Sequence, residues 1–146
     1  MKLTSAYRLP APPARVFAAL TDPVILCRCI EGCESLVASG EHAYDARLRI
    51  GLGSIKGTYA GTARLTELDP PRGFVLVIEG KGGAGWARGS ARMQLAADGD
   101  HTSLTSDADV QVGGAIAAVG SRLIDAAARR LSDRFFESLA RELSAA

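Results

Sequence analysis

The sequence GGAIAAVGSRLI, residues 113–124, joins a predicted sheet to a predicted helix. A pattern of alternating polar residues, typical of a strand, stops at its paired glycines, and apolar residues then recur mostly at every fourth position. This spacing predicts one apolar face of a long closing helix that ends near the C-terminus, made of Ile116, Leu123, Ala127, Leu131, Phe135, Leu139 and Leu143. A curved antiparallel sheet around such a helix leaves a cavity, so the pattern favours a small-molecule or lipid binder over a catalyst.

Length and composition fit one domain. The chain has 146 residues, of which 47% are hydrophobic, and a domain of this size buries about 68–70% of the surface of its unfolded chain. Its 17 lysines and arginines nearly balance its 16 aspartates and glutamates. Because no field of one sign is available to hold a phosphate backbone, the composition argues against a nucleic-acid partner.

The N-terminus and the cysteines predict a compartment. The first ten residues lack the apolar core of a signal peptide, and no uninterrupted apolar run approaches the roughly 18 residues of a membrane span. Cys27, Cys29 and Cys33 fall close together, which is no disulfide framework and fits a reducing environment. We therefore expect a cytoplasmic protein, at most peripheral at the inner face of the cell membrane.

The first third of the chain predicts a strand followed by two short helices. Residues 2–9 alternate as a strand does, and Pro12-Pro13 then preset the backbone for a helix. Asp22 is a candidate N-cap with Pro23 at the first helical position, so a second short helix is predicted up to about Ile30.

The middle of the chain predicts six strands in succession, which implies antiparallel hairpins. They are residues 35–39, 44–52, 55–68, 74–79, 87–96 and 102–112. On the longest of these strands, alternate side chains are expected to face the helix, and this set includes Ile55, Tyr59, Ala63 and Leu65. Gly57 and Gly61 belong to the same set, and they serve either the curvature of the sheet or the volume of the cavity.

The segment GKGGAG, residues 80–85, formally matches the dinucleotide-binding pattern G-x-G-x-x-G. A true fingerprint must open a helix whose N-terminus holds the pyrophosphate, whereas the residues that follow, 86–96, form a strand pattern. The segment is therefore predicted to be a hairpin loop, and no nucleotide is implied.

Metal and acid–base signals are weak. Cys27, Cys29 and Cys33 form the pattern C-x-C-x3-C, in which Cys29 and Cys33 lie four residues apart and could present two thiolates to a metal. No fourth ligand is apparent, so small buried thiols are the preferred interpretation. Asp107 and Asp109 share one face of the last strand, where exposure to solvent is the expected state. No Ser/His/Asp or Cys/His set is visible, so no catalytic residue and no metal ligand are predicted.

Several segments, in this order and spacing, resemble the carbon monoxide dehydrogenase G-subunit family, which belongs to the START/polyketide-cyclase helix-grip superfamily (SRPBCC). The resemblance covers nearly the whole chain and rests on residues 16–23, 29–33, 57–61, 69–71 and 113–124. One departure is Glu31, which replaces the proline of the family's usual Cys-Ile-Pro-Gly-Cys and adds a charge near the expected cavity entrance.

The resemblance implies an α+β fold in which a seven-stranded antiparallel sheet grips a long C-terminal helix, as one domain over residues 1–146. It further implies a noncatalytic accessory role beside a molybdenum hydroxylase of the carbon monoxide or xanthine dehydrogenase type. A quinone or lipid held in the apolar cavity is the implied ligand, with no covalently bound cofactor. Longer members carry a C-terminal extension that reaches the membrane, whereas this chain ends three residues after Leu143, so tethering by a tail is not expected.

The predicted cavity residues are Tyr59, Phe74, Leu76, Trp86, Met93, Ile116, Val119 and Leu123. Trp86 has two interpretations of equal weight, as a packing residue or as part of a hairpin that touches a membrane transiently. Two alternatives to a carrier stay open from the sequence. One is an enzyme of the polyketide-cyclase kind that works with a few polar groups in the cavity, and the other is a ligand-free adaptor for protein interactions.

Overall fold

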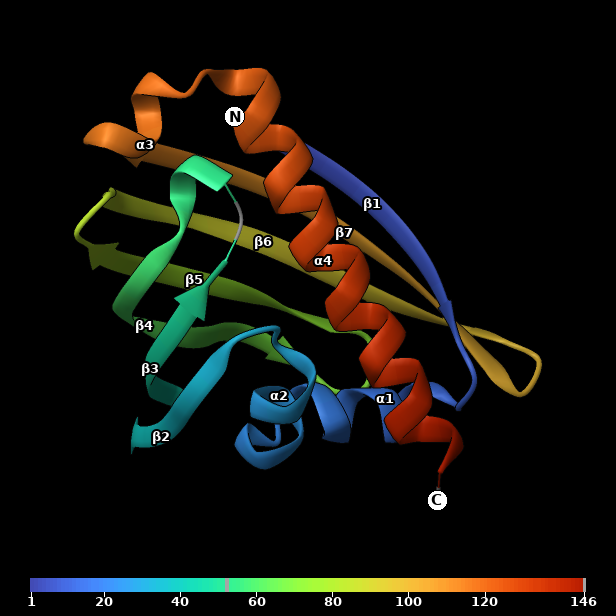
Figure 1. Cartoon of the computed structure of the whole chain (residues 1–146). Coiled ribbons are helices and arrows are strands. Elements are labelled where there is room, and N and C mark those ends of the chain that lie inside the picture. The colour runs from blue at the N-terminus through green and yellow to red at the C-terminus, as the bar shows by residue number, and fades with distance from the viewer. Residues whose placement is uncertain (52, 146) are drawn as a thin grey trace.

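The computed structural model describes residues 1–51 and 53–145 as a curved sheet wrapped around a long C-terminal helix, α4 (Ser121–Ser144) (Figure 1). The sheet has seven antiparallel strands in the order β1-β7-β6-β5-β4-β3-β2. They are β1 (Lys2–Leu9), β2 (Cys33–Gly40), β3 (Ala43–Ile50), β4 (Gly57–Asp69), β5 (Gly73–Gly82), β6 (Gly85–Asp98) and β7 (His101–Gly113). The predicted helix-grip architecture is confirmed.

Two short helices, α1 (Pro13–Leu20) and α2 (Pro23–Cys29), connect β1 to β2 as predicted. The carboxylate of Asp22 accepts a hydrogen bond of 2.9 Å from the backbone N–H of Val24, which is the expected N-cap. Each helix has proline in its first turn, where the missing N–H costs nothing.

The predicted strand over residues 55–68 begins later than expected. Ile55 belongs instead to a short 3-10 helix, η1 (Gly53–Ile55), and β4 starts at Gly57, whose φ is 146°. The hydroxyl of Tyr59 donates 2.7 Å to the carbonyl of Ile55 and closes this turn over the start of β4. The preceding strand, predicted over residues 44–52, ends at Ile50, and Leu52 lies outside the described residues.

The closing helix is two helices. A separate turn, α3 (Ala115–Ala118), precedes Gly120, whose φ of 95° breaks the helical path before α4 begins. Ile116 therefore lies on α3, and Val119 caps it, so neither belongs to the long helix as predicted. Within α4 the buried position near the helix start is Ile124, not Leu123 as predicted. Repeated steps of four residues drift away from the 3.6-residue turn, so Leu123 lies about 160° around the helix from the buried Leu139, whereas Ile124 lies about 60° from it.

The hydrophobic core fills one end of the grip. Leu104 and Leu139 are fully buried there, and Phe17 of α1 meets Phe74 of β5 edge to face with ring centroids 5.7 Å apart. At the opposite end, Gly82 pairs with Gly85 across the tight β5–β6 turn, which confirms a hairpin in place of a nucleotide loop. The two ends of the sheet are thus packed differently, and the less packed end holds the candidate site.

Candidate functional site

The inner face of the sheet, defined as the face that α4 covers, carries small side chains across its centre. Strand register places one such row side by side, consisting of Ala46, Gly61, Gly80 and Ala87. In the next row Ala63 and Gly89 flank Ile78. Since side chains of this size do not reach the helix, the register leaves a hollow above the middle strands.

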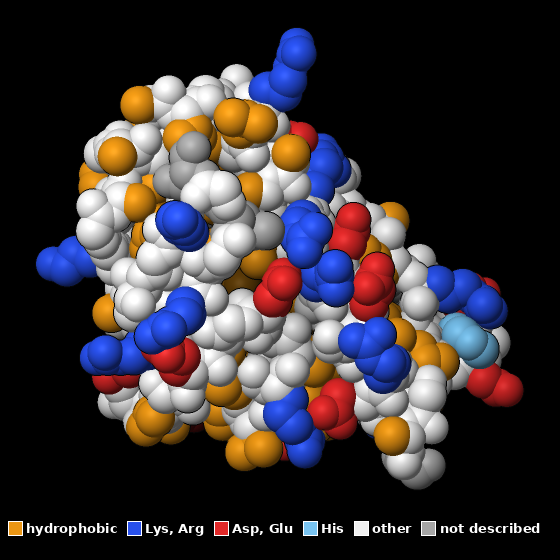
Figure 2. Space-filling view, viewed as in Figure 1, with side chains coloured by type: hydrophobic (Ala, Val, Ile, Leu, Met, Phe, Trp, Pro, Cys, Tyr) orange, Lys and Arg blue, Asp and Glu red, His pale blue; other side chains and the backbone are white. Residues whose placement is uncertain are grey.

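Ile78 shows that this hollow is open. It lies on β5, the fourth of seven strands, and shares the inner face with the buried Phe74. Its side chain is nevertheless 37% exposed. A central position on the covered face of a sheet is normally buried, and Figure 2, viewed from the side of α4, shows a recess beside the helix with hydrophobic side chains at its base. We use the term recess for the part of the inner face that carries Ile78 and its row neighbours Ala63 and Gly89.

The anchoring of α4 explains where the recess lies. Phe136, Leu139 and Leu143 in the C-terminal half of the helix belong to the hydrophobic core. Ile124 is buried near the helix start but packs outside that core. The helix is thus fixed by apolar packing at its C-terminal end, while its N-terminal half stands over the small residues of the sheet.

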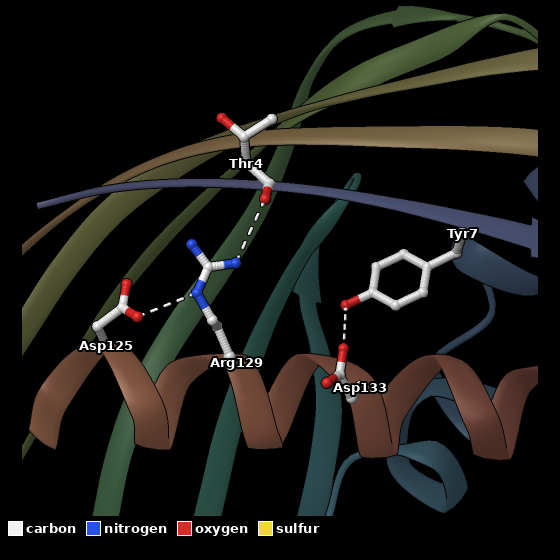
Figure 3. Close-up of polar contacts among 5 residues, drawn as sticks. All are labelled: Thr4, Tyr7, Asp125, Arg129 and Asp133. Carbon is white, nitrogen blue, oxygen red and sulfur yellow. Dashed lines mark hydrogen bonds and ion pairs between the residues drawn. The ribbon is translucent and has the colours of Figure 1, made fainter. Parts of the chain in front are cut away.

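Polar contacts along β1 hold the helix at its height above the sheet (Figure 3). The hydroxyl of Tyr7 points from β1 to α4, donates 2.8 Å to Asp133 Oδ1 and lies 2.8 Å from the Ser132 hydroxyl. One turn earlier, Arg129 Nη1 donates 3.5 Å to the carbonyl of Thr4. Burial raises the pKa of Tyr7 above its ordinary value, so the phenol stays protonated at neutral pH and remains a donor.

Trp86 stands at the rim of two grooves at the open end of the grip. Its ring covers Gly113, where a Cβ atom would collide with the indole, and Arg88 places its guanidinium carbon 5.2 Å from the ring centroid. One groove, of about 340 Å³, lies beside it on the outer face of β4, β5 and β6 and is not part of the space under α4. The other, of about 420 Å³, is lined by Met1, Trp86, Val110, Gln111, Val112, Ala117, Ser121 and Ile124.

The predicted cavity residues lie in several different parts of the structure. Tyr59, Leu76 and Met93 are half-buried on the inner face, and Phe74, on the same face, is buried in the core. Ile116 is buried on α3, with Val119 half-buried after it. Trp86 follows the parity of Arg88 onto the outer face and is 40% exposed, and Leu123 is 61% exposed.

Ile78, Ala63 and Gly89 were not among the predicted cavity residues, although Ala63 was expected on the face toward the helix. For Ile78 the signal was present, because strict alternation along residues 74–79 places it on the same face as Phe74 and Leu76. What the pattern lacked was the distance between that face and the helix.

The part of the chain that the structure describes shows no metal-binding cluster of three or more His, Cys, Asp or Glu residues. Nor does any helix within residues 1–51 and 53–145 have the length and hydropathy needed to cross a membrane. Asp107 and Asp109 are exposed on the outer face, as predicted.

Comparison with protein families matches residues 6–144 to the family of carbon monoxide dehydrogenase G subunits (CoxG). Comparison of the sequence with curated proteins gives no match.

Solved structures share the fold over nearly the whole chain. A conserved protein from Geobacillus kaustophilus is 32% identical, with a TM-score of 0.96 over 99% of this chain and 95% of that one. A START superfamily protein from Mycobacterium smegmatis is 11% identical, with a TM-score of 0.73 over 98% of this chain and 97% of that one. The Zhui aromatase/cyclase from Streptomyces sp. R1128 is 16% identical, with a TM-score of 0.72 over 99% and 93%.

Proposed function

The chain belongs to the carbon monoxide dehydrogenase G-subunit (CoxG) family, and we propose that it is a noncatalytic carrier that holds an apolar ligand in the recess. The family and the START-type fold support a ligand-binding accessory role. The proposed ligand is a quinone or a lipid-like tail, and the proposed beneficiary is a molybdenum hydroxylase of the carbon monoxide or xanthine dehydrogenase type.

The exposure of Ile78 carries the proposal. An apolar side chain at the centre of the inner face gains stability only when something apolar covers it, at about 25 cal/mol per Å² of surface removed from water. Its row neighbours Ala63 and Gly89 present no charge or polar group to an incoming tail. A hydrocarbon chain fits this chemistry, whereas a charged ligand would lose its hydration without gaining a partner.

The proposed partner rests on the family name, which associates the members of this family with carbon monoxide dehydrogenase. The test is retention of the molybdenum hydroxylase of the host on immobilised full-length chain. If the hydroxylase is not retained, either with or without ligand loaded on the chain, the accessory role is wrong. The carrier proposal is tested separately, by extraction.

We further propose that the open end touches a membrane transiently. Trp86 and Leu123 are both exposed there, and the cations Lys81 of β5 and Arg88 of β6 lie beside the indole. Exposed aromatic and aliphatic groups with adjacent cations suit an anionic lipid surface. Phosphatidylserine vesicles should sediment the wild-type chain at low salt and release the Trp86→Ser/Leu123→Ser double variant, and equal sedimentation of both would contradict this.

The carrier proposal is tested by extraction. Chain purified without detergent from a quinone-producing host is extracted with organic solvent, and the extract is quantified by mass spectrometry. We expect close to one quinone or lipid per chain in the wild type and a loss of most of it in Ile78→Asp, because a carboxylate in the recess repels the tail. Because the side chain at position 78 is already partly exposed to solvent, the variant should still fold.

Leu123→Asp is the control, since it introduces the same carboxylate in place of an apolar side chain at a more exposed site, and it should keep its ligand. An empty wild-type extract would favour the adaptor, and turnover of an aromatic polyketide would favour the cyclase-like enzyme.

A further inference from the structure

Cys27 and Cys33 bring their sulfur atoms together. Cys27 lies on α2 and Cys33 is the first residue of β2, and their Sγ atoms share a hydrogen bond of 2.7 Å. Both are free thiols and both are half-buried. Cys29 lies two positions from Cys27 on the same helix, which turns its side chain about 200° away, and it is buried in the core.

The backbone fixes this pair. Gly32, directly before Cys33, has a φ of 80°, and its carbonyl accepts 2.8 Å from the N–H of Arg49 on β3. A Cβ atom at Gly32 would collide with the carbonyl oxygen of Arg49, so glycine is needed for the close approach. The N–H of Cys33 donates 3.1 Å to the carbonyl of Ile30 at the end of α2. The position of Cys33 is therefore fixed by the hydrogen bonds of the turn that joins α2 to β2.

We propose that Cys27 and Cys33 are a modification site, which closes to a reversible intramolecular disulfide when the protein meets hydrogen peroxide. The bond would join the last turn of α2 to the first residue of β2 and leave Cys29 as a thiol. This inference is independent of the ligand.

The chemistry assigns different tasks to the two thiols. Burial, then the hydrogen bond and charge of Cys27, raise the pKa of Cys33 to about 12, so Cys33 keeps its proton at neutral pH. Cys27 therefore attacks first. Its sulfur bonds to one peroxide oxygen, the O–O bond breaks, and the departing hydroxide takes a proton to become water, which leaves a sulfenic acid.

The second step closes the disulfide. The sulfur of Cys33 attacks the sulfur of Cys27, the S–O bond breaks, and the leaving oxygen takes up the proton of Cys33 to become a second water. Together the two sulfurs lose two electrons, and the peroxide gains them. A dithiol such as dithiothreitol reverses the reaction by exchange.

The disulfide would stiffen a segment that touches two other elements. Glu31, between the two cysteines, lies 3.9 Å from Arg130 of α4, and Arg28 on α2 pairs with Glu142 of α4 at 2.9 Å. Oxidation would thus restrict the motion of the α2–β2 connection, which lies between α4 and β3, and would leave the contacts of the other elements unchanged.

The test uses the reduced full-length chain, diluted and treated with equimolar hydrogen peroxide. Remaining thiols are then alkylated, and the chain is digested and mapped by mass spectrometry without reductant. We expect the peptides carrying Cys27 and Cys33 to be linked, with Cys29 alkylated, and dithiothreitol to restore all three thiols. A link to Cys29, links between chains, sulfinic or sulfonic acids, or three unreacted thiols would each overturn the proposal.

Variants give the matched controls. Cys29→Ser should form the disulfide as the wild type does, whereas Cys27→Ser and Cys33→Ser should form none. Circular dichroism confirms that each variant folds, and the wild-type peptide map decides the proposal even where a variant does not.

Discussion

The rings of Tyr7 and Phe136 stack with their centroids 4.1 Å apart and their planes inclined by 21°. They come from opposite ends of the chain, on β1 and α4. The hydroxyl of the same tyrosine reaches Asp133 and Ser132 one turn earlier on the helix. Tyr7 therefore joins the first strand to the last helix by apolar packing and by hydrogen bonds at once.

The two parts of this contact can be separated by mutation. Tyr7→Phe keeps the stack and removes the hydroxyl, which should lower the free energy of unfolding by about 1 kcal/mol. Tyr7→Ala removes both and should cost about 3 kcal/mol. Urea denaturation measures the difference. Equal losses in the two variants would mean that the ring contributes nothing, contrary to the stack.

Alkaline pH should destabilise the reduced protein through Cys33. Its pKa is raised from 9.0 to about 12, first by burial. Because the unfolded chain releases this proton at lower pH than the folded one, stability is fully present below about pH 9 and falls as pH rises toward 12. Unfolding of Cys33→Ser under reductant should show a shallower decline between these values. Burial also raises the pKa of Cys29, Tyr7 and Tyr59, so part of the decline remains. Identical slopes would refute the assignment.

Filling the recess should displace the ligand without unfolding the protein. Ala63→Leu adds three carbons beside Ile78 in a space that is open to solvent, so the expected change in stability is below about 1.5 kcal/mol. The quinone or lipid recovered per chain should fall at least severalfold. Ala60→Leu places the same side chain on the outer face of the same strand and should keep its ligand. If Ala63→Leu yields as much quinone or lipid per chain as the wild type, the recess is not the binding site.

Gly32→Ala should weaken both the fold and the cysteine pair. The left-handed backbone and the collision with the carbonyl of Arg49 together should lower the free energy of unfolding by about 1–3 kcal/mol. The shifted turn should also lower the yield of the Cys27–Cys33 disulfide. Gly83→Ala is the control, because a Cβ atom there meets open space, and its cost should stay below about 0.5 kcal/mol. A variant as stable as this control would contradict the role of Gly32.

Local signals predicted most of the fold. Alternation located every strand to within a few residues, and Asp22 with Pro23 set the start of α2 correctly. The break at Gly120 was missed, because glycine inside a helix costs only about 1 kcal/mol and apolar spacing continues on both sides. The exposure of Leu123 was missed for another reason: a spacing of four residues drifts around a helix of 3.6 residues per turn, which brings Ile124, not Leu123, onto the buried side.

The recess could not be predicted in full for a different reason. Parity places Ile78 on the inner face, but its exposure depends on how far α4 stands from the sheet. That distance is set by contacts such as Tyr7 with Asp133, which join residues at opposite ends of the sequence. No local pattern encodes such a pair.

The uneven anchoring of α4 separates the residues that hold the fold from those that would hold a cargo. Phe136, Leu139 and Leu143 lie in the core, whereas Ala63, Ile78 and Gly89 lie apart from it on the open part of the sheet. Changes among the second group cost little folding free energy, since they leave the first group untouched. For the carrier proposed above, selection could therefore alter the preferred ligand in small steps on a scaffold that stays folded throughout.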